Sequence, residues 1–222
     1  MKTTAEITEY YDNKLPYFKY DIEYQNPRHN RIKTSLSGIV KRDSKVLELG
    51  CGIGVISKFM AQLGAHVTAV DLSPKVIEYA KANMSHKNIE YVNQDITDMM
   101  PATAYDVIVL ADVFEHIQRE KIYDLMDVIK NHSNENTVIY LNIPDGRFQA
   151  FMKKNHFEKL QIVDEVYQLS EILIKFGVIG FTPSKIDIYG IDVVYQYNEI
   201  VFISDKKLGK YYSAISQRMG KA

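Results

Sequence analysis

Short apolar runs alternate with helical patterns along the first two thirds of the chain, and this alternation constrains the fold more than any other feature. The runs are rich in Val, Ile and Leu and occupy residues 46–49, 66–70, 89–92, 107–111 and 138–142. Helical spacing of apolar residues occupies 55–63, 74–84 and 119–132. Strands buried on both faces and joined by helices are typical of βαβ units. The chain is therefore predicted to have an α/β, doubly wound fold.

The pattern changes after Pro144. Residues 146–156 are basic and aromatic without a clear period, which indicates a loop or a short helix, and a helical pattern follows at 166–176. Two further strands are expected at 185–189 and 199–204 with no helix between them, which predicts an antiparallel hairpin at a sheet edge. The prediction is thus a seven-stranded, mostly parallel sheet with an antiparallel C-terminal hairpin strand and helices on both faces. A helix at 28–40 leads into the first strand.

Composition excludes several classes of protein. The 222 residues include 27 Lys and Arg and 28 Asp and Glu, a net charge of −1. Proteins that bind a phosphate backbone usually carry a basic excess, so we expect no nucleic-acid partner. The polar N-terminus lacks the apolar core of a signal peptide, and no apolar run approaches the roughly 18 residues of a membrane span. We expect a single-domain cytoplasmic protein without membrane contact; monomer and homodimer both stay open.

Three glycines, Gly50, Gly52 and Gly54, follow the first apolar run at alternate positions and open the next helix. Glycine allows a tight turn and a close approach of the backbone to a ligand. The N–H groups at the start of the helix favour a polar or anionic group. Cys51, the single cysteine of the chain, has no partner for a disulfide and is expected to be a small packing residue in the turn.

Acidic residues around this turn narrow the type of ligand. The dinucleotide pattern requires a glycine where this chain has Val55, and it does not require Glu48. Asp71 ends the second apolar run, 21 residues after Gly50, which is the distance at which an acidic side chain meets ribose hydroxyls. These features favour a nucleoside cofactor other than a dinucleotide, so an NAD-dependent oxidoreductase is the weaker alternative.

The segments 46–54, 67–73, 93–97 and 105–117 together resemble those of the Rossmann-like, class I S-adenosylmethionine-dependent methyltransferases, and the layout resembles their small-molecule branch. The resemblance implies that the cofactor is S-adenosylmethionine. Its implied contacts are Glu48, Gly50, Cys51, Gly52 and Gly54 to the methionine part, Asp71 to the ribose, Leu72, Asp95 and Ile96 to the adenine, and Ala111 and Asp112 at the end of the fourth strand.

By the same resemblance, residues 1–44 are an N-terminal helical lid, 45–144 the cofactor-binding core, and 145–222 an acceptor-side insertion and the C-terminal sheet edge. A lid that folds over the cofactor would exclude water. Tyr11 is the expected lid contact to the cofactor, because its ring offers apolar area and a polar tip. Arg28 or Arg31 could pair with the cofactor carboxylate, and we prefer Arg31.

The acceptor is the open question. His116 is the candidate general base, although a structural role is the stronger alternative. No metal is expected. Arg147, Lys153, Lys154 and His156 would suit a phosphorylated or otherwise anionic molecule, or else form a solvated basic face. The main hypothesis is methyl transfer to an oxygen of a small polar metabolite, carbohydrate-linked or phosphorylated. Alternatives are N-methylation of an amine or amino sugar, and a non-catalytic S-adenosylmethionine-binding partner subunit.

Overall fold

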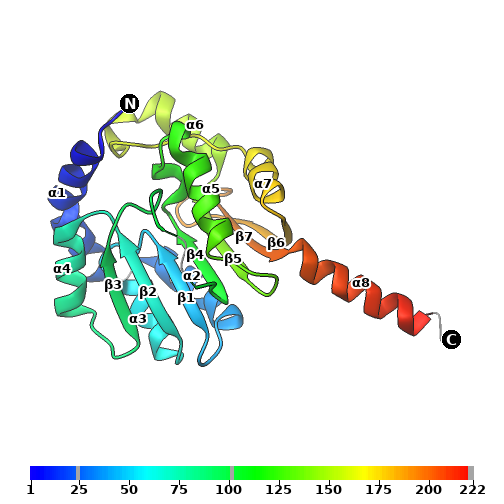
Figure 1. Ribbon diagram of the computed structural model, residues 1–222. Helices are drawn as coiled ribbons and strands as arrows, with labels where there is room; N and C mark the ends of the chain where they lie inside the picture. Colours follow the sequence, from blue (N-terminus) through cyan, green and yellow to red (C-terminus); the bar gives the residue numbers. More distant parts are fainter. Residues whose placement is uncertain (24–25, 101–102, 220–222) are drawn as a thin grey trace.

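The computed structural model describes residues 1–23, 26–100 and 103–219 and contains one seven-stranded sheet (Figure 1). The strand order is β3-β2-β1-β4-β5-β7-β6, in which β1 to β5 pair in parallel and β7 is antiparallel to both of its neighbours. The predicted fold class, with its C-terminal antiparallel hairpin, is therefore confirmed. The strands are β1 (Lys45–Leu49), β2 (His66–Asp71), β3 (Ile89–Asn93), β4 (Val107–Ala111), β5 (Val138–Pro144), β6 (Phe181–Tyr189) and β7 (Tyr197–Ser204).

Helices cover both faces of the sheet because side chains alternate along each buried strand. Leu47 and Leu49 pack on the face covered by α5 and α7, whereas Val46 packs on the face covered by α2, α3 and α4. The α-helices are α1 (Thr4–Glu23), α2 (Pro27–Ile39), α3 (Val55–Gln62), α4 (Pro74–Asn83), α5 (Ile122–Asn131), α6 (Gly146–Asn155), α7 (Leu169–Val178) and α8 (Asp205–Met219). None of the helices in the described part of the chain is long and apolar enough to span a membrane.

Local sequence signals explain where several helices begin. Ser73 caps α4, its hydroxyl accepting from the Val76 amide at 3.2 Å, and a proline takes the first helical position. Asp145 caps α6 in the same way through the amide of Arg147 at 2.9 Å. The segment 146–156, which has no clear apolar period, is therefore a helix of ten residues, because its cap and its contacts outweigh the weak pattern.

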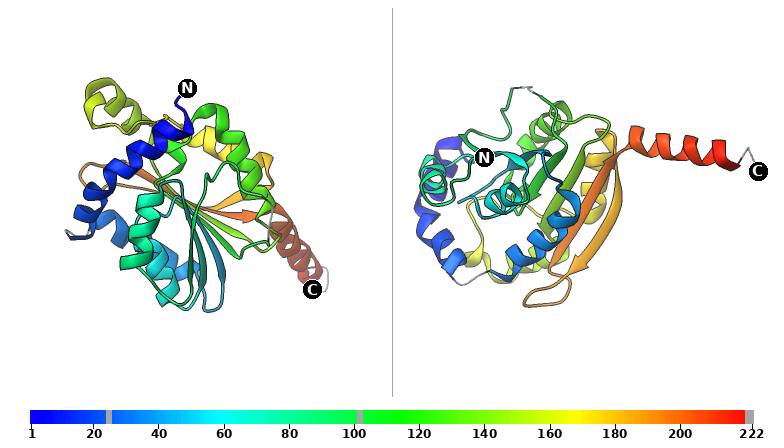
Figure 2. Two further views of the ribbon diagram at one scale, coloured as in Figure 1. Left: turned by 60° about the vertical axis from the view of Figure 1, so that its left-hand side comes forward. Right: turned by 90° about the horizontal axis from the view of Figure 1, so that it is seen from below.

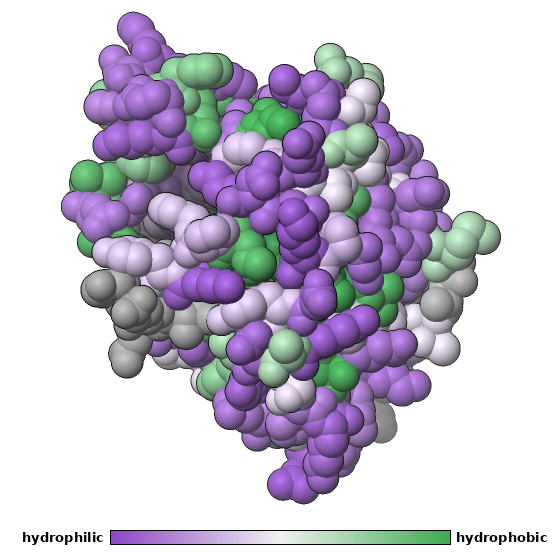
Figure 3. Space-filling model, turned by 90° about the vertical axis from the view of Figure 1, so that its left-hand side faces the viewer, coloured by the Kyte–Doolittle hydropathy of each residue, from purple (hydrophilic) through white to green (hydrophobic). Residues whose placement is uncertain are grey.

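Helices α1 and α8 are the two long helices outside the alternating core. The first lies beside α4 at one end of the sheet, on a mostly hydrophilic face with small, separate hydrophobic patches (Figures 1 and 3). The second was not predicted and projects away from the domain in every view (Figures 1 and 2). Its exposed Tyr211, Tyr212 and Ile215 lack the burial that an amphipathic pattern normally indicates.

We expect Leu47→Ala to lower the free energy of unfolding by about 2–5 kcal/mol, because Leu47 is fully buried in a central strand and its truncation leaves a cavity. Chemical denaturation monitored by circular dichroism measures the change. The control is Ile174→Ala, at a side chain that is 66% exposed, where the change should stay within about 0.5 kcal/mol. Equal losses in the two variants would contradict the assigned core.

Candidate functional site

A cavity of about 640 Å³ opens at the carboxyl ends of β1, β2 and β4. The strand order reverses between β1 and β4, since the chain adds β2 and β3 on one side and β4 and β5 on the other. Open α/β sheets bind ligands at such a reversal because the connecting loops diverge there. Most of the site residues expected from the sequence line this cavity: Tyr11, Glu48, Gly50, Cys51, Gly52, Asp71, Leu72, Asp95, Ile96, Ala111, Asp112 and His116.

The glycine turn lines the cavity at the end of β1 through Gly50 and Gly52, whereas Gly54 lies outside the lining. Gly50, Gly52 and Gly54 have φ angles of 73°, 51° and 84°, in the left-handed region that disfavours other residues. A Cβ on Gly50 would overlap the side chain of Val113, so the turn also needs glycine for packing. A Cβ on Gly52 would meet no atom within 4 Å, and Gly52 lines the cavity. Its backbone is thus open to a ligand.

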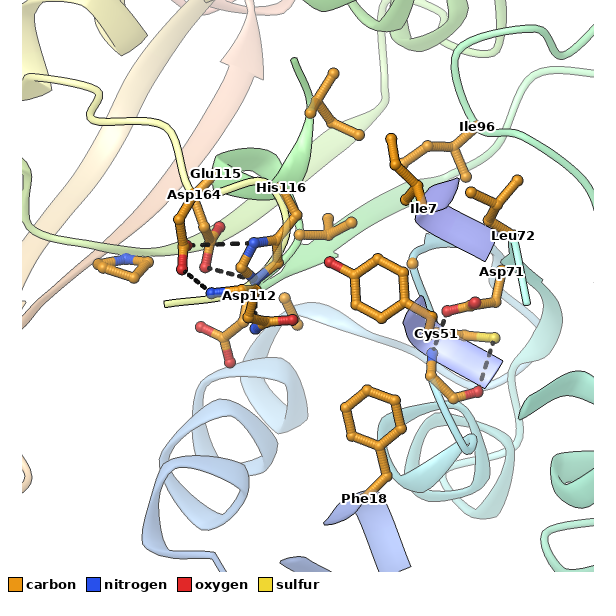
Figure 4. Close-up of a pocket in the computed structure, with 18 of the residues that line it drawn as sticks. Ile7, Phe18, Cys51, Asp71, Leu72, Ile96, Asp112, Glu115, His116 and Asp164 are labelled. Carbon is orange, nitrogen blue, oxygen red and sulfur yellow. Dashed lines mark hydrogen bonds and ion pairs between the residues drawn. The ribbon is translucent and has the colours of Figure 1, made fainter. Parts of the chain in front are cut away.

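Asp71 connects the glycine turn to the end of β2. Its Oδ2 accepts a hydrogen bond from the Gly52 amide at 2.9 Å (Figure 4). Its Oδ1 accepts one from the Ser73 amide at 3.0 Å. Burial raises the pKa of Asp71, and these amide donors act in the opposite direction. The carboxyl group is therefore fixed in orientation at the cavity wall.

Glu48 is the buried acid beneath the turn. Its side chain is 2% exposed, and the Ser57 hydroxyl donates to its Oε2. Burial raises the pKa of Glu48 to about 8. It lines the cavity from β1, so it meets a ligand as a group that is largely protonated at neutral pH.

An apolar subsite lies on the β2 and β3 side of the cavity. Leu72 and Ile96 lie close together there, with Ile7 of α1 beside them (Figure 4). Asp95 is held at its rim by a local turn, its Oδ1 accepting from the Thr97 amide at 2.9 Å and the Thr97 hydroxyl at 2.7 Å. The arrangement suits a flat apolar ring with a polar edge.

Asp112 lies on the opposite side, just beyond Ala111 at the end of β4. Its φ of 57° is unusual for a residue other than glycine, and two neighbours hold it there. The Asn142 amide donates to its Oδ1 at 2.6 Å, and the Arg28 Nε forms an ion pair with its Oδ2 at 2.7 Å. Arg28 also donates to the Tyr197 hydroxyl at 2.9 Å, so a single guanidinium serves this side of the cavity.

The structure does not place Arg31, the arginine preferred as partner of the cofactor carboxylate, at the cavity. Arg31 does not line the cavity; its guanidinium pairs with Asp187 and lies 3.4 Å from the Glu199 carboxylate. Both arginines come from α2, one turn apart, and only Arg28 faces the cavity. The acids on β6 and β7 that hold Arg31 are distant in sequence, so its spacing on the helix did not reveal them.

Helix α1 supplies one wall of the cavity through Ile7, Tyr11 and Phe18. The Tyr11 hydroxyl is buried and has no hydrogen-bond partner among the described residues. A buried polar atom without a partner is costly, and this one lies at the cavity. The neighbouring Asp12 accepts a hydrogen bond from the Ser73 hydroxyl at 2.5 Å, which ties α1 to the start of α4.

His116 follows β4 in a short 3-10 helix, with its ring centroid 6.4 Å from that of Tyr11. Its Nδ1 lies 2.8 Å from the Val163 carbonyl, which can only accept, so Nδ1 carries the proton. Its Nε2 lies 2.9 Å from the Gln161 amide nitrogen, so Nε2 accepts. Burial lowers the pKa of His116. The ring is therefore neutral, and both nitrogens have protein partners.

The basic residues after β5 do not form an anion site. Arg147 pairs with Asp145 at 2.9 Å, Lys153 donates to the Asp164 carbonyl at 3.2 Å, and neither lines the cavity. Lys154 and His156 are also outside it; α6 instead presents Phe148, Gln149 and Met152. Of the two readings of this segment, the position of these four residues outside the cavity favours the solvated basic face over an anionic pocket.

Several lining residues escaped prediction, namely Phe148, Gln149, Met152, Gln161 and Asp164. They come from α6 and from the irregular segment after it, where neither a helical nor an alternating pattern assigns a face. Within the described ranges, no three His, Cys, Asp or Glu side chains are arranged to hold a metal ion.

Residues 46–136 match the family model described as "Methyltransferase domain". The mitochondrial ubiquinone biosynthesis O-methyltransferase of Schizosaccharomyces pombe is 39% identical over 93 residues, which cover 39% of this chain and 34% of that protein. A ubiquinone biosynthesis O-methyltransferase of Xylella fastidiosa is 36% identical over 102 residues, covering 42% of this chain and 41% of that protein. This chain thus spans about two fifths or less of the length of these curated relatives.

Among solved structures, magnesium protoporphyrin IX methyltransferase of Synechocystis PCC 6803 with bound SAM superimposes with a TM-score of 0.69. The match covers 92% of this chain and 98% of that chain at 15% identity. This likeness supports the same fold over nearly the whole length, whereas the family model matches residues 46–136, which include the glycine turn and Asp71.

We expect the pH dependence of stability to differ between the wild type and Glu48→Gln. Because the pKa of Glu48 is raised from 4.5 to about 8, the folded protein keeps a proton that the unfolded chain releases. The free energy of unfolding of the wild type relative to that of the variant is then highest below about pH 4.5. This difference falls by about 1 kcal/mol per pH unit until the pH passes about 8. Denaturation between pH 4 and pH 9 measures this.

The matched control for that titration is Glu90→Gln, at an exposed glutamate of β3. Its stability should follow that of the wild type at every pH. A constant difference between the wild type and Glu48→Gln across the range would contradict the raised pKa.

Proposed function

We propose, from the match of residues 46–136 to the methyltransferase-domain family model, that this chain transfers a methyl group from S-adenosylmethionine to an oxygen of a small molecule. The observation that carries the proposal is the cavity at the strand reversal, where the open backbone of Gly52 and the fixed carboxyl of Asp71 meet. The O-methyltransferases among the curated relatives support oxygen as the acceptor.

The residues around the cavity fit S-adenosylmethionine in shape and chemistry. The Asp71 carboxyl would accept hydrogen bonds from the ribose hydroxyls, and the apolar subsite of Leu72 and Ile96 would hold the adenine with Asp95 at its polar edge. The open floor at Gly52 and the unpartnered Tyr11 hydroxyl are the two features that a ligand would complete. When bound, the cofactor supplies a methyl group activated by its sulfonium charge.

The methionine end of the cofactor would lie between the glycine turn and the end of β4. Gly50, Cys51 and Gly54 shape the turn beside buried Glu48, and Ala111 and Asp112 face it from β4. Arg28 is the guanidinium available for the cofactor carboxylate, since Arg31 is held outside the cavity. Pairing with that carboxylate would compete with the Arg28–Asp112 ion pair.

Methyl transfer requires alignment of the acceptor with the methyl group more than it requires proton chemistry. Helix α1 would help by covering the site and excluding water. His116 can accept a proton only through Nε2, because Nδ1 donates to Val163, and Gln161 must then give up its hydrogen bond. We therefore keep His116 as a candidate base for a hydroxyl acceptor and assign it an orienting role in the resting site.

A carbohydrate-linked acceptor stays within the proposal, whereas a phosphorylated one loses its support because the basic segment lies outside the cavity. N-methylation of an amine is the second candidate, and the acidic side chains around His116 favour it over the remaining alternatives. A non-catalytic partner subunit would bind the cofactor without turnover. Cytoplasmic location, the absence of nucleic-acid and membrane partners, and the oligomeric state stay predictions from the sequence.

We expect Asp71→Asn to weaken S-adenosylmethionine binding by about 10–100-fold, because charge-assisted hydrogen bonds to the ribose are lost. Isothermal titration calorimetry measures the dissociation constant. The control is Asp98→Asn, an exposed acid outside the cavity, whose binding should equal that of the wild type. No binding to the wild type, with circular dichroism of a folded protein, would refute the proposed function.

A second pair of variants tests which arginine serves the cofactor. Lysine keeps the charge of arginine and loses its two-point geometry. Arg28→Lys should weaken binding about tenfold, and Arg31→Lys should leave it within about twofold. The same calorimetric titration compares the two. A larger loss of affinity in Arg31→Lys than in Arg28→Lys would instead assign the contact with the cofactor carboxylate to Arg31.

A further inference from the structure

The end of the cavity away from Leu72 and Ile96 is rich in acidic side chains. Asp112, Glu115 and Asp164 converge there around His116 (Figure 4). We call the space lined by these four residues and Gln161 the acceptor chamber. Arg28 is the one guanidinium that faces it among the described lining residues, and Asp112 already pairs with it at 2.7 Å.

Other cationic side chains of the cavity lining do not balance the acceptor chamber. Lys121 lies on the adenine side, 3.9 Å from the Asp95 carboxylate. Lys2 and Lys159 are exposed to solvent. His116 is neutral for the reasons given above. In the described structure, no lysine or arginine forms an ion pair with the carboxyl group of Glu115 or Asp164, and the Lys153 ammonium reaches only the backbone carbonyl of Asp164, at 3.2 Å.

Glu115 is an independent sign of a missing ligand group. Its residue is 2% exposed, it lines the cavity, and its Oε2 has no hydrogen-bond partner. The Oε1 of the same carboxyl lies 3.7 Å from His116 Nε2, too far for a hydrogen bond. The Gln161 Oε1 beside it is also buried without a partner. Two residues that line the chamber thus each have a buried acceptor oxygen to which no protein group donates.

Asp164 is held in position by neutral donors. The Gln149 amide donates to its Oδ1 at 2.8 Å, and the Gln161 backbone amide donates to its Oδ2 at 2.7 Å. These bonds orient the carboxylate without cancelling its charge. The nearby walls formed by Phe148, Met152 and Leu160 are apolar, so the chamber combines acidic oxygens with room for a hydrocarbon or ring.

We propose that the acceptor chamber binds a molecule that carries a protonated amine on an apolar or ring body, with Glu115 and Asp164 receiving the ammonium group. An ammonium offers donors to the unpartnered oxygens and a charge opposite to the acids. Carboxylates and phosphates are excluded by the same acids. The inference rests on the proposed function, which assigns the other end of the cavity to the methyl donor.

The electrostatic setting of Glu115 agrees with this assignment. Burial raises the pKa of its carboxyl well above the usual range, Asp112 and Asp164 raise it further, and Arg28 opposes them. A bound ammonium would offset the free-energy cost of ionising the buried Glu115 carboxyl group, because it would pair with the carboxylate. If Arg28 turns to the cofactor carboxylate, the chamber loses its only guanidinium and selects more strongly for a cation.

The test compares three phenols whose two-carbon side chain at the para position ends in an ammonium, a hydrogen or a carboxylate: tyramine, 4-ethylphenol and 3-(4-hydroxyphenyl)propanoate. Binding to the full chain saturated with S-adenosylhomocysteine is measured by calorimetry or ligand-observed NMR at pH 7. We expect tyramine to bind at least about tenfold more tightly than the propanoate, with 4-ethylphenol between them. Equal or tighter binding of the propanoate, or no binding of tyramine, overturns the proposal.

Two isosteric variants assign the effect to the chamber. Glu115→Gln and Asp164→Asn should each reduce the tyramine preference by about threefold or more, whereas Glu158→Gln, at a side chain 70% exposed, should leave it unchanged. A preference that survives both chamber variants overturns the assignment. If either variant fails to fold, the ranking of the three phenols on the wild type decides the question.

The prior titration with S-adenosylhomocysteine separates this inference from the proposed function. Failure of that titration counts against the methyl donor site alone. The three phenols are then compared on the unliganded protein, where a tyramine preference would support a cation site and its absence would refute it.

Discussion

The hydrogen bond from the Gly52 amide to the Asp71 carboxyl joins the glycine turn after β1 to the end of β2. It connects the two sides of the strand-end floor and leaves the Gly52 backbone open above it. The bond exists because parallel pairing of β1 with β2 brings both strand ends to one edge of the sheet. The cavity, the apolar subsite and the buried Glu48 are all arranged around that edge.

Electrostatics divides the cavity into two unlike ends. On the β2 and β3 side, acids are satisfied by backbone amides and local turns, as at Asp71 and Asp95. On the β4 side, Asp112 needs Arg28, and Glu115 has an oxygen without any donor. On the β2 and β3 side the polar groups therefore have their hydrogen-bond partners. On the β4 side acceptor oxygens lie in a low-dielectric space, where an unpaired polar group costs free energy.

Most of the fold could be predicted from repeated local patterns in the sequence. The strands β1 to β5, the glycine turn and the position of Asp71 follow from buried apolar runs and fixed spacings, which depend on near neighbours in the chain. Arg31 and the face of α6 depend on distant partners such as Asp187 and Asp164. Sequence periodicity does not predict such long-range pairings. The part of the site formed by residues after Pro144 could therefore be assigned only from the structure.

The cavity is lined by two separate parts of the chain, because Ile7, Tyr11 and Phe18 of α1 form a wall beside the sheet. The sheet, with its switch point and glycine turn, is assembled from residues after Lys45, and nothing in its pairing involves α1. The wall on that side, in contrast, is α1, which packs against α4 and is tied to it by the hydrogen bond between Ser73 and Asp12. The contacts at the strand ends and the wall that covers them thus come from separate parts of the chain, and Tyr11 is the residue of α1 that belongs to both.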